Sequence, residues 1–281
     1  MGWFQALTAG MIQGFTEFLP ISSSGHLVIY DALVGDGGGQ SLGFTVLLHL
    51  ATLTSVTVAF RKDVWVIVRA FFGVLRDLPR GRPDFGSPDR QLLLMVIFGT
   101  VPAVLAGLLV KAARLDAMMG SIFVVAAMLL VTAAMMALVD RFGKGGRTEA
   151  DAPYKASWAV GLLQAAALLP GLSRSGATIF GGRAFGLGRE FAVRYAFLLS
   201  IPAILGAGLL EGIQAAKEGS LGFGPLEGLI GFIAASFCGL IAIGLLRRLI
   251  VKGRFKIFAV YCLAASAFAF AVGFGLIGNG P

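Results

Sequence analysis

The sequence predicts an all-α integral membrane protein, on the basis of its composition, its long apolar runs and two polar interruptions in further apolar stretches. Of the 281 residues, 57% are hydrophobic and 14% are charged, and the mean hydropathy is +0.86. A soluble domain carries roughly 25% charged residues. The composition therefore excludes an ordinary water-soluble globule and a disordered chain.

Six apolar runs are close to the roughly 20 residues that a helix needs to cross a bilayer. They are Phe44–Phe60, Leu92–Val110, Ser121–Val139, Phe191–Leu210, Gly228–Leu246 and Ile257–Ile277. We predict a transmembrane helix at each. Val64–Leu75 is shorter and carries Arg69, which favours a helix lying at the membrane surface. Cys238 and Cys262 fall inside apolar runs and are interpreted as packing residues.

Two further apolar stretches are interrupted by segments rich in Pro, Gly and Ser. The first comprises Trp3–Leu19, the letters PISSSGH and Leu27–Val34; the second comprises Trp158–Leu169, the letters PGLSRSGAT and a resumption at Ile179. Irregular backbone at membrane depth is tolerated only where protein or a water-filled cavity surrounds it. We therefore predict two re-entrant helix–loop–helix hairpins, at residues 3–34 and 158–185, with two kinked full spans as the alternative.

The chain also divides into two similar halves within a single membrane domain. The interrupted stretches match at five pairs of positions: Gly10 with Gly161, Gln13 with Gln164, Ser22 with Ser173, Ser24 with Ser175, and Gly25 with Gly176. Each stretch is followed by three predicted spans. This pattern indicates an internal duplication, with residues 1–150 as the first repeat and 151–281 as the second.

The distribution of Lys and Arg predicts the orientation of these halves. Residues 61–90, 140–155 and 247–256 hold seven, four and five basic residues, whereas residues 1–43 hold none and 211–227 hold one. Basic loops face the cytoplasm. Both termini are therefore expected outside, and the two halves are expected to be inserted upside down relative to each other, as in inverted-repeat proteins whose ligand sites lie near the midplane.

The net charge of +8 belongs mainly to these short loops, so nucleic acid is not an expected partner. No Lys or Arg precedes Arg61, and the basic region of a cleavable signal peptide is missing. We therefore expect the N-terminal segment to be retained.

Polar and ionisable side chains concentrate in the two hairpins. The first supplies Gln13, Glu17, Ser22, Ser23, Ser24 and His26, and the second supplies Ser173, Arg174, Ser175 and Thr178. A charge at the bilayer centre costs roughly 2.5–3.5 kcal/mol, so Glu17 and Arg174 each need a partner or a water-filled cavity. A simple ion pair between the two would meet that need, but it would not explain the serines and the histidine beside it.

This set of side chains has the parts needed to bind and cleave a phosphate ester or anhydride. Glu17 and Gln13 offer oxygen ligands that suit a hard divalent cation, Mg²⁺ or Ca²⁺. Arg174 presents a bidentate fork to phosphate oxygens, and hydroxyls with backbone amides at a broken helix end form an anion cradle. His26 serves as a base, acid or nucleophile near neutral pH. With two His and no nearby Cys, zinc is disfavoured, and no Walker loop is present.

The two interruptions resemble the signature motifs of bacterial undecaprenyl-diphosphate phosphatases of the bacitracin-resistance type. The matching residues are Gln13, Glu17, Pro20, Ser22, Ser23, Gly25 and His26 in QGFTEFLPISSSGH, and Pro170, Gly171, Ser173, Arg174, Ser175, Gly176 and Thr178 in PGLSRSGAT. The resemblance covers the whole chain, including its length and its six spans and two hairpins.

The resemblance implies an enzyme of the bacterial inner membrane that removes one phosphate from undecaprenyl diphosphate and so recycles the lipid carrier for cell-wall synthesis. It implies a divalent cation, a polyprenyl diphosphate substrate within the membrane lipids, and an active site that opens to the periplasm. It leaves the oligomeric state open, with a homodimer as one alternative.

The resemblance also implies roles for single residues. Glu17 and Gln13 would hold the metal and the diphosphate. The phosphates would be gripped by Arg174, Ser173, Ser175 and Thr178, with Ser22 and Ser24 also in the binding set. Ser23 or His26 would attack the terminal phosphate or activate its attacker, and the sequence does not decide between them.

Three positions depart from the family pattern or stand apart from its motifs. Gln13 replaces an acid often found there, which removes one ligand charge and predicts weaker metal affinity. Arg194 stands where a Glu is expected; it either contacts lipid phosphate or snorkels to the cytoplasmic end of its helix, and we favour snorkelling. For His49, in the middle of a span, we favour a hydrogen-bonded packing role over membership of the site.

Two other classes of function are compatible with the sequence. A transporter or flippase of polyprenyl phosphate would use the same inverted-repeat site, and release of inorganic phosphate by the purified protein distinguishes the enzyme from it. A structural membrane subunit would leave the Ser, His and Arg cluster unexplained.

Overall fold

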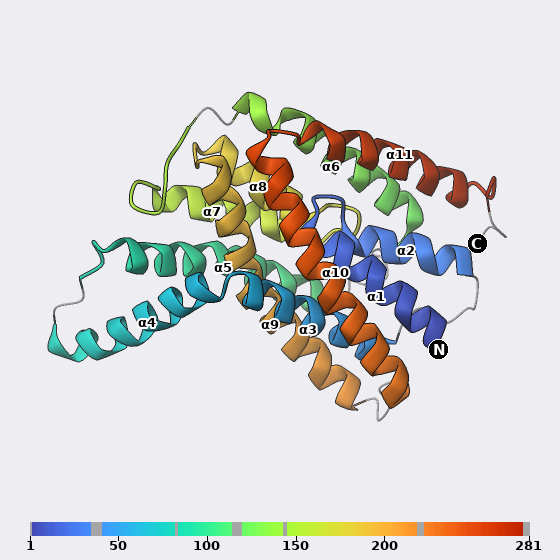
Figure 1. The fold of residues 1–281 in the computed structure, drawn as a ribbon, viewed down its shortest axis with the longest axis horizontal. Helices are drawn as coiled ribbons and strands as arrows, with labels where there is room; N and C mark the ends of the chain where they lie inside the picture. Colours follow the sequence, from blue (N-terminus) through green and yellow to red (C-terminus); the bar gives the residue numbers. More distant parts are fainter. Residues whose placement is uncertain are drawn as a thin grey trace.

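The computed structural model describes residues 2–34, 41–81, 84–113, 120–142, 145–217 and 222–277, and these residues form helices joined by short connections (Figure 1). The α-helices are α1 (Trp3–Phe18), α2 (Ser23–Val34), α3 (Leu42–Ala59), α4 (Arg61–Asp77), α5 (Pro88–Ala112), α6 (Ile122–Phe142), α7 (Tyr154–Ala166), α8 (Arg174–Ala184), α9 (Arg189–Lys217), α10 (Pro225–Val251) and α11 (Lys256–Gly273). A 3₁₀ turn, η1 (Leu78–Arg80), follows α4. The first residue of the predicted first repeat and the last four of the second lie outside the described residues.

The prediction of six long apolar helices is confirmed. Within the described residues, α3, α5, α6, α9, α10 and α11 are long and apolar enough to cross a membrane. Their ends differ from the prediction, because a helix continues through polar residues once its backbone hydrogen bonds are established. The last helix is shorter than predicted: α11 ends at Gly273, and Gly275 has a left-handed φ of 69°.

The segment predicted as a surface helix is helical and begins earlier than expected. The helix α4 starts at Arg61 rather than Val64, and Ala70 is its buried residue in the described part of the structure. It combines exposed Trp65 and Phe72 with charged side chains. Such a helix has an apolar face and a polar face, as an interfacial helix does.

The two interruptions are shorter than predicted. Apolar character resumes at Leu27 and Ile179 in the sequence, but the helices already begin at Ser23 and Arg174. The prediction was wrong because the serine turns cap the helices. The Ser22 hydroxyl accepts from the Gly25 amide at 3.3 Å in α2, and the Ser173 hydroxyl accepts from the Gly176 amide at 3.1 Å in α8. The polar motifs therefore form the first helical turns rather than loops.

The interrupted helix pairs extend to opposite sides of the molecule from the place where they meet (Figure 1). The pair α1 and α2 lies to the right of the view, and the pair α7 and α8 lies to the left. Each first helix packs on a helix of the other half: α1 on α10, and α7 on α5. The third long helices of the two halves, α6 and α11, lie side by side.

Glycines allow these helix pairs to approach closely. A Cβ added to Gly10 would lie 2.6 Å from the Gly231 carbonyl oxygen, and one added to Gly14 would lie 2.5 Å from that of Ala235. In the other half, a Cβ on Gly161 would lie 2.5 Å from the Gly99 carbonyl oxygen. Small residues that bring backbones together are a common basis of helix packing in membranes.

A buried aromatic layer crosses the centre of the molecule. The Phe197 ring lies 5.6 Å from that of Phe18 and 5.3 Å from that of Phe60, measured between centroids, and all three side chains are buried. Phe18 is the neighbour of Glu17, while Phe60 joins α3 to α4. The three rings therefore form a continuous buried contact that leads from the end of α1, beside Glu17, to the junction of α3 and α4.

Candidate active site

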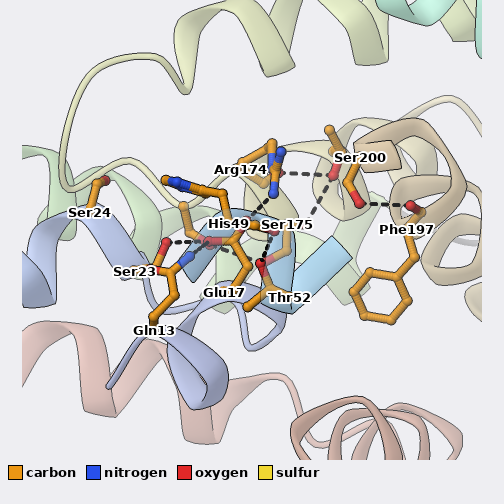
Figure 2. Close-up of polar contacts among 12 residues, drawn as sticks. Gln13, Glu17, Ser23, Ser24, His49, Thr52, Arg174, Ser175, Phe197 and Ser200 are labelled. Carbon is orange, nitrogen blue, oxygen red and sulfur yellow. Dashed lines mark hydrogen bonds and ion pairs between the residues drawn. The ribbon is translucent and has the colours of Figure 1, made fainter. Parts of the chain in front are cut away.

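Glu17 lies at the centre of a polar cluster that joins the two interrupted helix pairs (Figure 2). Gln13 Nε2 donates to Glu17 Oε2 at 3.0 Å, and Ser23 Oγ donates to the same oxygen at 2.6 Å. Arg174, from the other half, forms an ion pair with Glu17 Oε1. The structure therefore brings together four of the residues singled out in the sequence.

This cluster is shielded from solvent. Gln13 has no exposed surface and Glu17 is 7% exposed, whereas the Arg174 side chain retains 23% of its surface. Burying a carboxylate is costly unless hydrogen bonds and an opposite charge compensate it. Three donors satisfy Glu17, so it is held as an ionised acceptor, and the guanidinium remains partly accessible to a ligand.

Local helix geometry explains how these side chains meet. Gln13 and Glu17 are four residues apart in α1 and so share a face. Ser23 is the first residue of α2, and Arg174 is the first residue of α8. The site is thus formed by the end of one helix and the beginnings of two others. Free backbone amides at helix beginnings favour anions.

The remaining serines link the motifs to each other. Ser175 Oγ donates to the Leu19 carbonyl oxygen at 3.1 Å and lies 3.2 Å from Ser173 Oγ, so it connects the two halves. Ser22 Oγ lies 3.4 Å from Ser24 Oγ. The hydroxyl of buried Thr178 donates to carbonyl oxygens within its own helix α8, at 2.9 and 3.2 Å.

His26 makes a separate set of contacts. Its Nδ1 lies 2.7 Å from the Ser22 carbonyl oxygen, and its Nε2 lies 2.7 Å from Tyr261 Oη on α11. The His26 and Tyr261 rings stack with centroids 5.6 Å apart and planes 14° apart. Both ring nitrogens are therefore engaged, and none of these contacts is with the carboxylate or the guanidinium of the cluster.

Sequence reasoning missed two residues that support the motifs. Tyr261 holds His26 from the largely apolar helix α11, and Thr132 on α6 binds the backbone of the second motif. Thr132 Oγ1 donates to the Gly171 carbonyl oxygen and accepts from the Ser173 amide, both at 3.0 Å. A lone Tyr or Thr within an apolar run carries no pattern that distinguishes it from a packing residue.

His49 and Arg194 were left between two interpretations, and the structure locates both. His49 Nδ1 bonds the Thr45 carbonyl oxygen at 3.0 Å, and the residue also lies within electrostatic range of Glu17 (Figure 2). It is thus a hydrogen-bonded helix residue that borders the site. Arg194 pairs with Asp63 at 2.7 Å and with Glu149 at 2.8 Å, so its guanidinium is engaged by protein carboxylates.

Gln13 offers one oxygen atom that is free to bind a hard cation such as Mg²⁺ or Ca²⁺. Gln13 Oε1 is buried and has no hydrogen-bond partner in the described part of the structure, while the Nε2 of the same amide donates to Glu17. No group of three or more His, Cys, Asp or Glu side chains suited to a metal occurs among the described residues. A cation here would therefore rely on few protein oxygens, as Mg²⁺ does when phosphate and water complete its shell.

The chain was compared with known protein families. The family described as "Bacitracin resistance protein BacA" matches residues 6–268. The chain belongs to this family. The family match includes both motifs and all but a few terminal residues of the described helices, so the expected resemblance is confirmed over nearly the whole chain.

Relatives over nearly the full length carry one name. A protein of Korarchaeum cryptofilum named undecaprenyl-diphosphatase is 43% identical over 259 residues, covering 92% of this chain and 95% of its own. A protein of that name from Methanosphaera stadtmanae is 40% identical, covering 92% and 93%, and one from Paenarthrobacter aurescens is 36% identical, covering 99% of both chains.

Proposed function

We propose that this protein is a membrane phosphatase that hydrolyses undecaprenyl diphosphate to undecaprenyl phosphate and inorganic phosphate. The observation that carries the proposal is the buried Glu17 carboxylate, which accepts hydrogen bonds from Ser23 in one motif and pairs with Arg174 in the other. Family membership and the name shared by the reported relatives support the same activity. The product would serve again as the lipid carrier for cell-wall synthesis.

Arg174 has two states in this proposal. Without substrate, it neutralises Glu17, which compensates two charges in a shielded place. When a diphosphate arrives, its oxygens offer the guanidinium a bidentate partner. Arg174 then turns to the phosphate and stabilises the charge of the transition state, and Glu17 is released to act as a base.

Ser23 is the proposed nucleophile. Its Oγ attacks the terminal phosphorus, its proton passes to Glu17 Oε2 at 2.6 Å, and undecaprenyl phosphate leaves with the bridging oxygen. Water then attacks the phosphoserine, inorganic phosphate is released, and the proton returns to Ser23 Oγ. His26 is the less favoured nucleophile, because both of its ring nitrogens already have partners.

Gln13 and Glu17 are the residues that would hold a divalent cation, Mg²⁺ or Ca²⁺. The unpartnered oxygen of Gln13 supports this assignment. When bound, the cation would neutralise phosphate charge. The binding set also includes Ser22, Ser24, Ser173, Ser175 and Thr178; of these, Ser173 and Ser22 already cap the helices that face the site.

The proposed topology is an inverted repeat with two re-entrant hairpins. Its support is the arrangement of the helices: α1–α2 and α7–α8 extend to opposite sides from their shared contact, and each pair packs on a helix of the other half (Figure 1). The charge pattern supports termini and an active site that face outward. The apolar outer faces would contact lipid or, in a homodimer, a second copy, and light scattering of the purified protein distinguishes these states.

The test is phosphate release from undecaprenyl diphosphate by the detergent-purified protein, with and without a chelator. We expect Arg174→Ala and Glu17→Ala each to lower turnover at least about 100-fold. Arg248→Ala, at an exposed position of α10, and Glu227→Ala, at a half-buried position in the first turn of the same helix, serve as controls for charge removal. Near-normal turnover by folded Arg174→Ala protein would contradict the proposal.

Nothing in the described part of the structure or in the reported relatives favours the alternative of a polyprenyl phosphate transporter. The same assay separates the two functions, because a transporter without phosphatase activity releases no inorganic phosphate. Chelation is expected to lower turnover, and full turnover without any divalent cation would exclude the assigned role of Gln13.

A further inference from the structure

A polar cavity lies at the Phe60 end of the aromatic layer, away from the Phe18 end that adjoins Glu17. Its volume is about 610 Å³. Its walls come from the junction of α3 and α4, from residues 146–149, from the beginning of α9 and from the last turns of α10. Phe60 lines it, whereas no residue of the Glu17 cluster does. The cavity is therefore distinct from the candidate active site.

We infer that this cavity binds a phosphate group. Four arginines line it, Arg147, Arg189, Arg194 and Arg247, against three acidic residues. Such a concentration of arginine in one concave place is typical of sites for anions with several oxygens. The inference goes beyond the phosphatase proposal and does not depend on it.

Two of the four arginines are already neutralised. Arg194 pairs with Asp63 at 2.7 Å and with Glu149 at 2.8 Å, and Arg189 pairs with Asp140 at 2.8 Å. These pairs connect α9 to α4, to the segment before α7 and to α6. These ion pairs hold the walls of the cavity together. They engage Asp63 and Glu149, two of its three acidic lining residues.

The other two arginines have no carboxylate partner among the described residues. The Arg247 guanidinium lies over the Phe60 ring, with its carbon 5.4 Å from the ring centroid. Stacking uses the face of the guanidinium and leaves the N–H donors at its edge available. Arg147 donates one long bond, at 3.4 Å, to the Phe185 carbonyl oxygen, which leaves further donors available.

Backbone hydrogen bonds hold the segment that carries Arg147 in place. The Arg147 amide donates to the Gly186 carbonyl oxygen at 3.1 Å, and the Gly188 amide donates to the Arg147 carbonyl oxygen at 2.8 Å. This short extended pairing holds Arg147 against the beginning of α9. Arg189, Glu190 and Phe191, in the first turn of that 29-residue helix, line the same cavity. The first amides of a helix have no acceptor within it, which favours a nearby anion.

The position in the chain indicates which phosphates are available. Asp63, residues 146–149 and Arg247 belong to the basic segments that the sequence predicts on the cytoplasmic side, and the beginning of α9 packs against them. There the phosphate could belong to the headgroup of an anionic lipid or to a soluble phosphate. The third acidic lining residue, Glu190, would repel a ligand with many negative charges. A single phosphate group is therefore favoured over a polyanion.

The experiment compares two matched variants of the full-length protein. Arg147→Gln/Arg247→Gln removes the unpaired donors, and Arg248→Gln removes the adjacent exposed arginine, which does not line the cavity. Inorganic phosphate is titrated onto the detergent-purified proteins, and binding is measured by calorimetry. In a second arm, phosphatidic acid in phosphatidylcholine nanodiscs is counted by native mass spectrometry, against phosphatidylcholine alone.

We expect the double variant to bind at least one probe tenfold more weakly than Arg248→Gln does. A loss confined to the lipid arm identifies a headgroup, and a loss for inorganic phosphate identifies a soluble ligand; both support the inference. Phosphate that binds at the candidate active site binds equally to both variants, so it does not contribute to the difference between them. Equal binding of both probes by the two variants would overturn the inference.

A second measurement needs no substitution. Phenylglyoxal modifies accessible arginines, and peptide mass spectrometry locates the products. We expect whichever probe binds to protect Arg247 but not Arg248 in the unaltered protein. Equal modification of Arg247 with and without both probes would count against the site even if the double variant failed to fold. Thermal unfolding in detergent reports that each variant is folded.

Discussion

Glu17 shows how a single buried residue can depend on both halves of a chain. Its two carboxylate oxygens accept from α1 and α2 on one side and from α8 on the other. Each donor alone would leave the charge undercompensated at this depth. The catalytic proposal follows from this shared dependence, because a ligand that takes Arg174 away also changes what Glu17 does.

Replacing Ser23 by Ala tests the nucleophile. The variant lacks the hydroxyl that donates to Glu17 at 2.6 Å, so we expect phosphate release to fall by at least about 1000-fold while substrate still binds. Turnover with radiolabelled substrate measures the loss, and acid quenching of the unaltered protein should trap labelled phosphoserine.

Ser87→Ala is the matched control, since its side chain makes no capping hydrogen bond at α5. If Ser23→Ala kept substantial turnover, the attacking group would have to be His26 or a water molecule.

Replacing Tyr261 by Phe tests whether the His26 orientation matters. The variant keeps the stacked ring but loses the hydrogen bond of 2.7 Å to Nε2. A hydrogen bond contributes about 0.5–1.5 kcal/mol, so we expect kcat to fall roughly two- to tenfold with KM unchanged. Steady-state kinetics measures the effect.

A double-mutant cycle distinguishes positioning from general structure. If Tyr261 acts through His26, adding Tyr261→Phe to His26→Ala should cause no further loss. Tyr30→Phe, which breaks a bond of 2.8 Å to Thr8 elsewhere in the first hairpin, is the control. Full additivity of the two changes would mean that Tyr261 does not work through the imidazole.

The sequence predicted the identity of the site residues better than their contacts. Glu17 and Arg174 stood out because a charge in an apolar stretch requires compensation, and the structure pairs them. Tyr261 and Thr132 could not be predicted, because a hydroxyl in an apolar helix gives no sign of its partner until the helices are packed. The burial of Thr178 and the partners of Arg194 depended on packing in the same way.

The length of the apolar runs was enough to predict the individual long helices, but it did not predict where each helix begins and ends. Six runs became six long helices, since a helix satisfies its own backbone in an apolar medium. The helix starts at Ser23 and Arg174 were missed because capping by Ser22 and Ser173 is local chemistry that hydropathy does not register. The packing of α1 on α10 was likewise beyond a one-dimensional pattern.

Replacing Gly14 by Ala tests the contact between α1 and α10. The added Cβ would lie 2.5 Å from the Ala235 carbonyl oxygen and 2.7 Å from Cys238 Cβ, so the helices must separate. We expect a loss of about 1–3 kcal/mol in stability, with lower turnover because Glu17 is displaced. Thermal unfolding in detergent measures the first effect.

Gly244→Ala on α10 is the control, since nothing lies within 4 Å of its added Cβ. It should leave stability unchanged or slightly raised. Equal behaviour of the two variants would show that α1 and α10 are not held by close backbone contact.

The orientation of the whole molecule is testable with introduced cysteines, because native Cys238 and Cys262 are both buried. We expect Leu276→Cys, at a position 76% exposed, to react with a membrane-impermeant maleimide on intact cells. We expect Gly86→Cys, in the basic connection between α4 and α5, to react only after permeabilisation. The reverse pattern would invert the proposed topology and move the active site to the cytoplasm.

The close contact between α1 and α10 has a consequence for biosynthesis. Helices emerge from the ribosome in order, so the first of them is made long before the surface on which it rests, more than 200 residues later. The partners of Glu17 on α2 and α8 are made earlier, so the carboxylate can be paired before the helix that carries it has its packing surface. Completion of the penultimate helix is therefore the step at which the first helix becomes fixed in place, and the proposed activity would be acquired only after it.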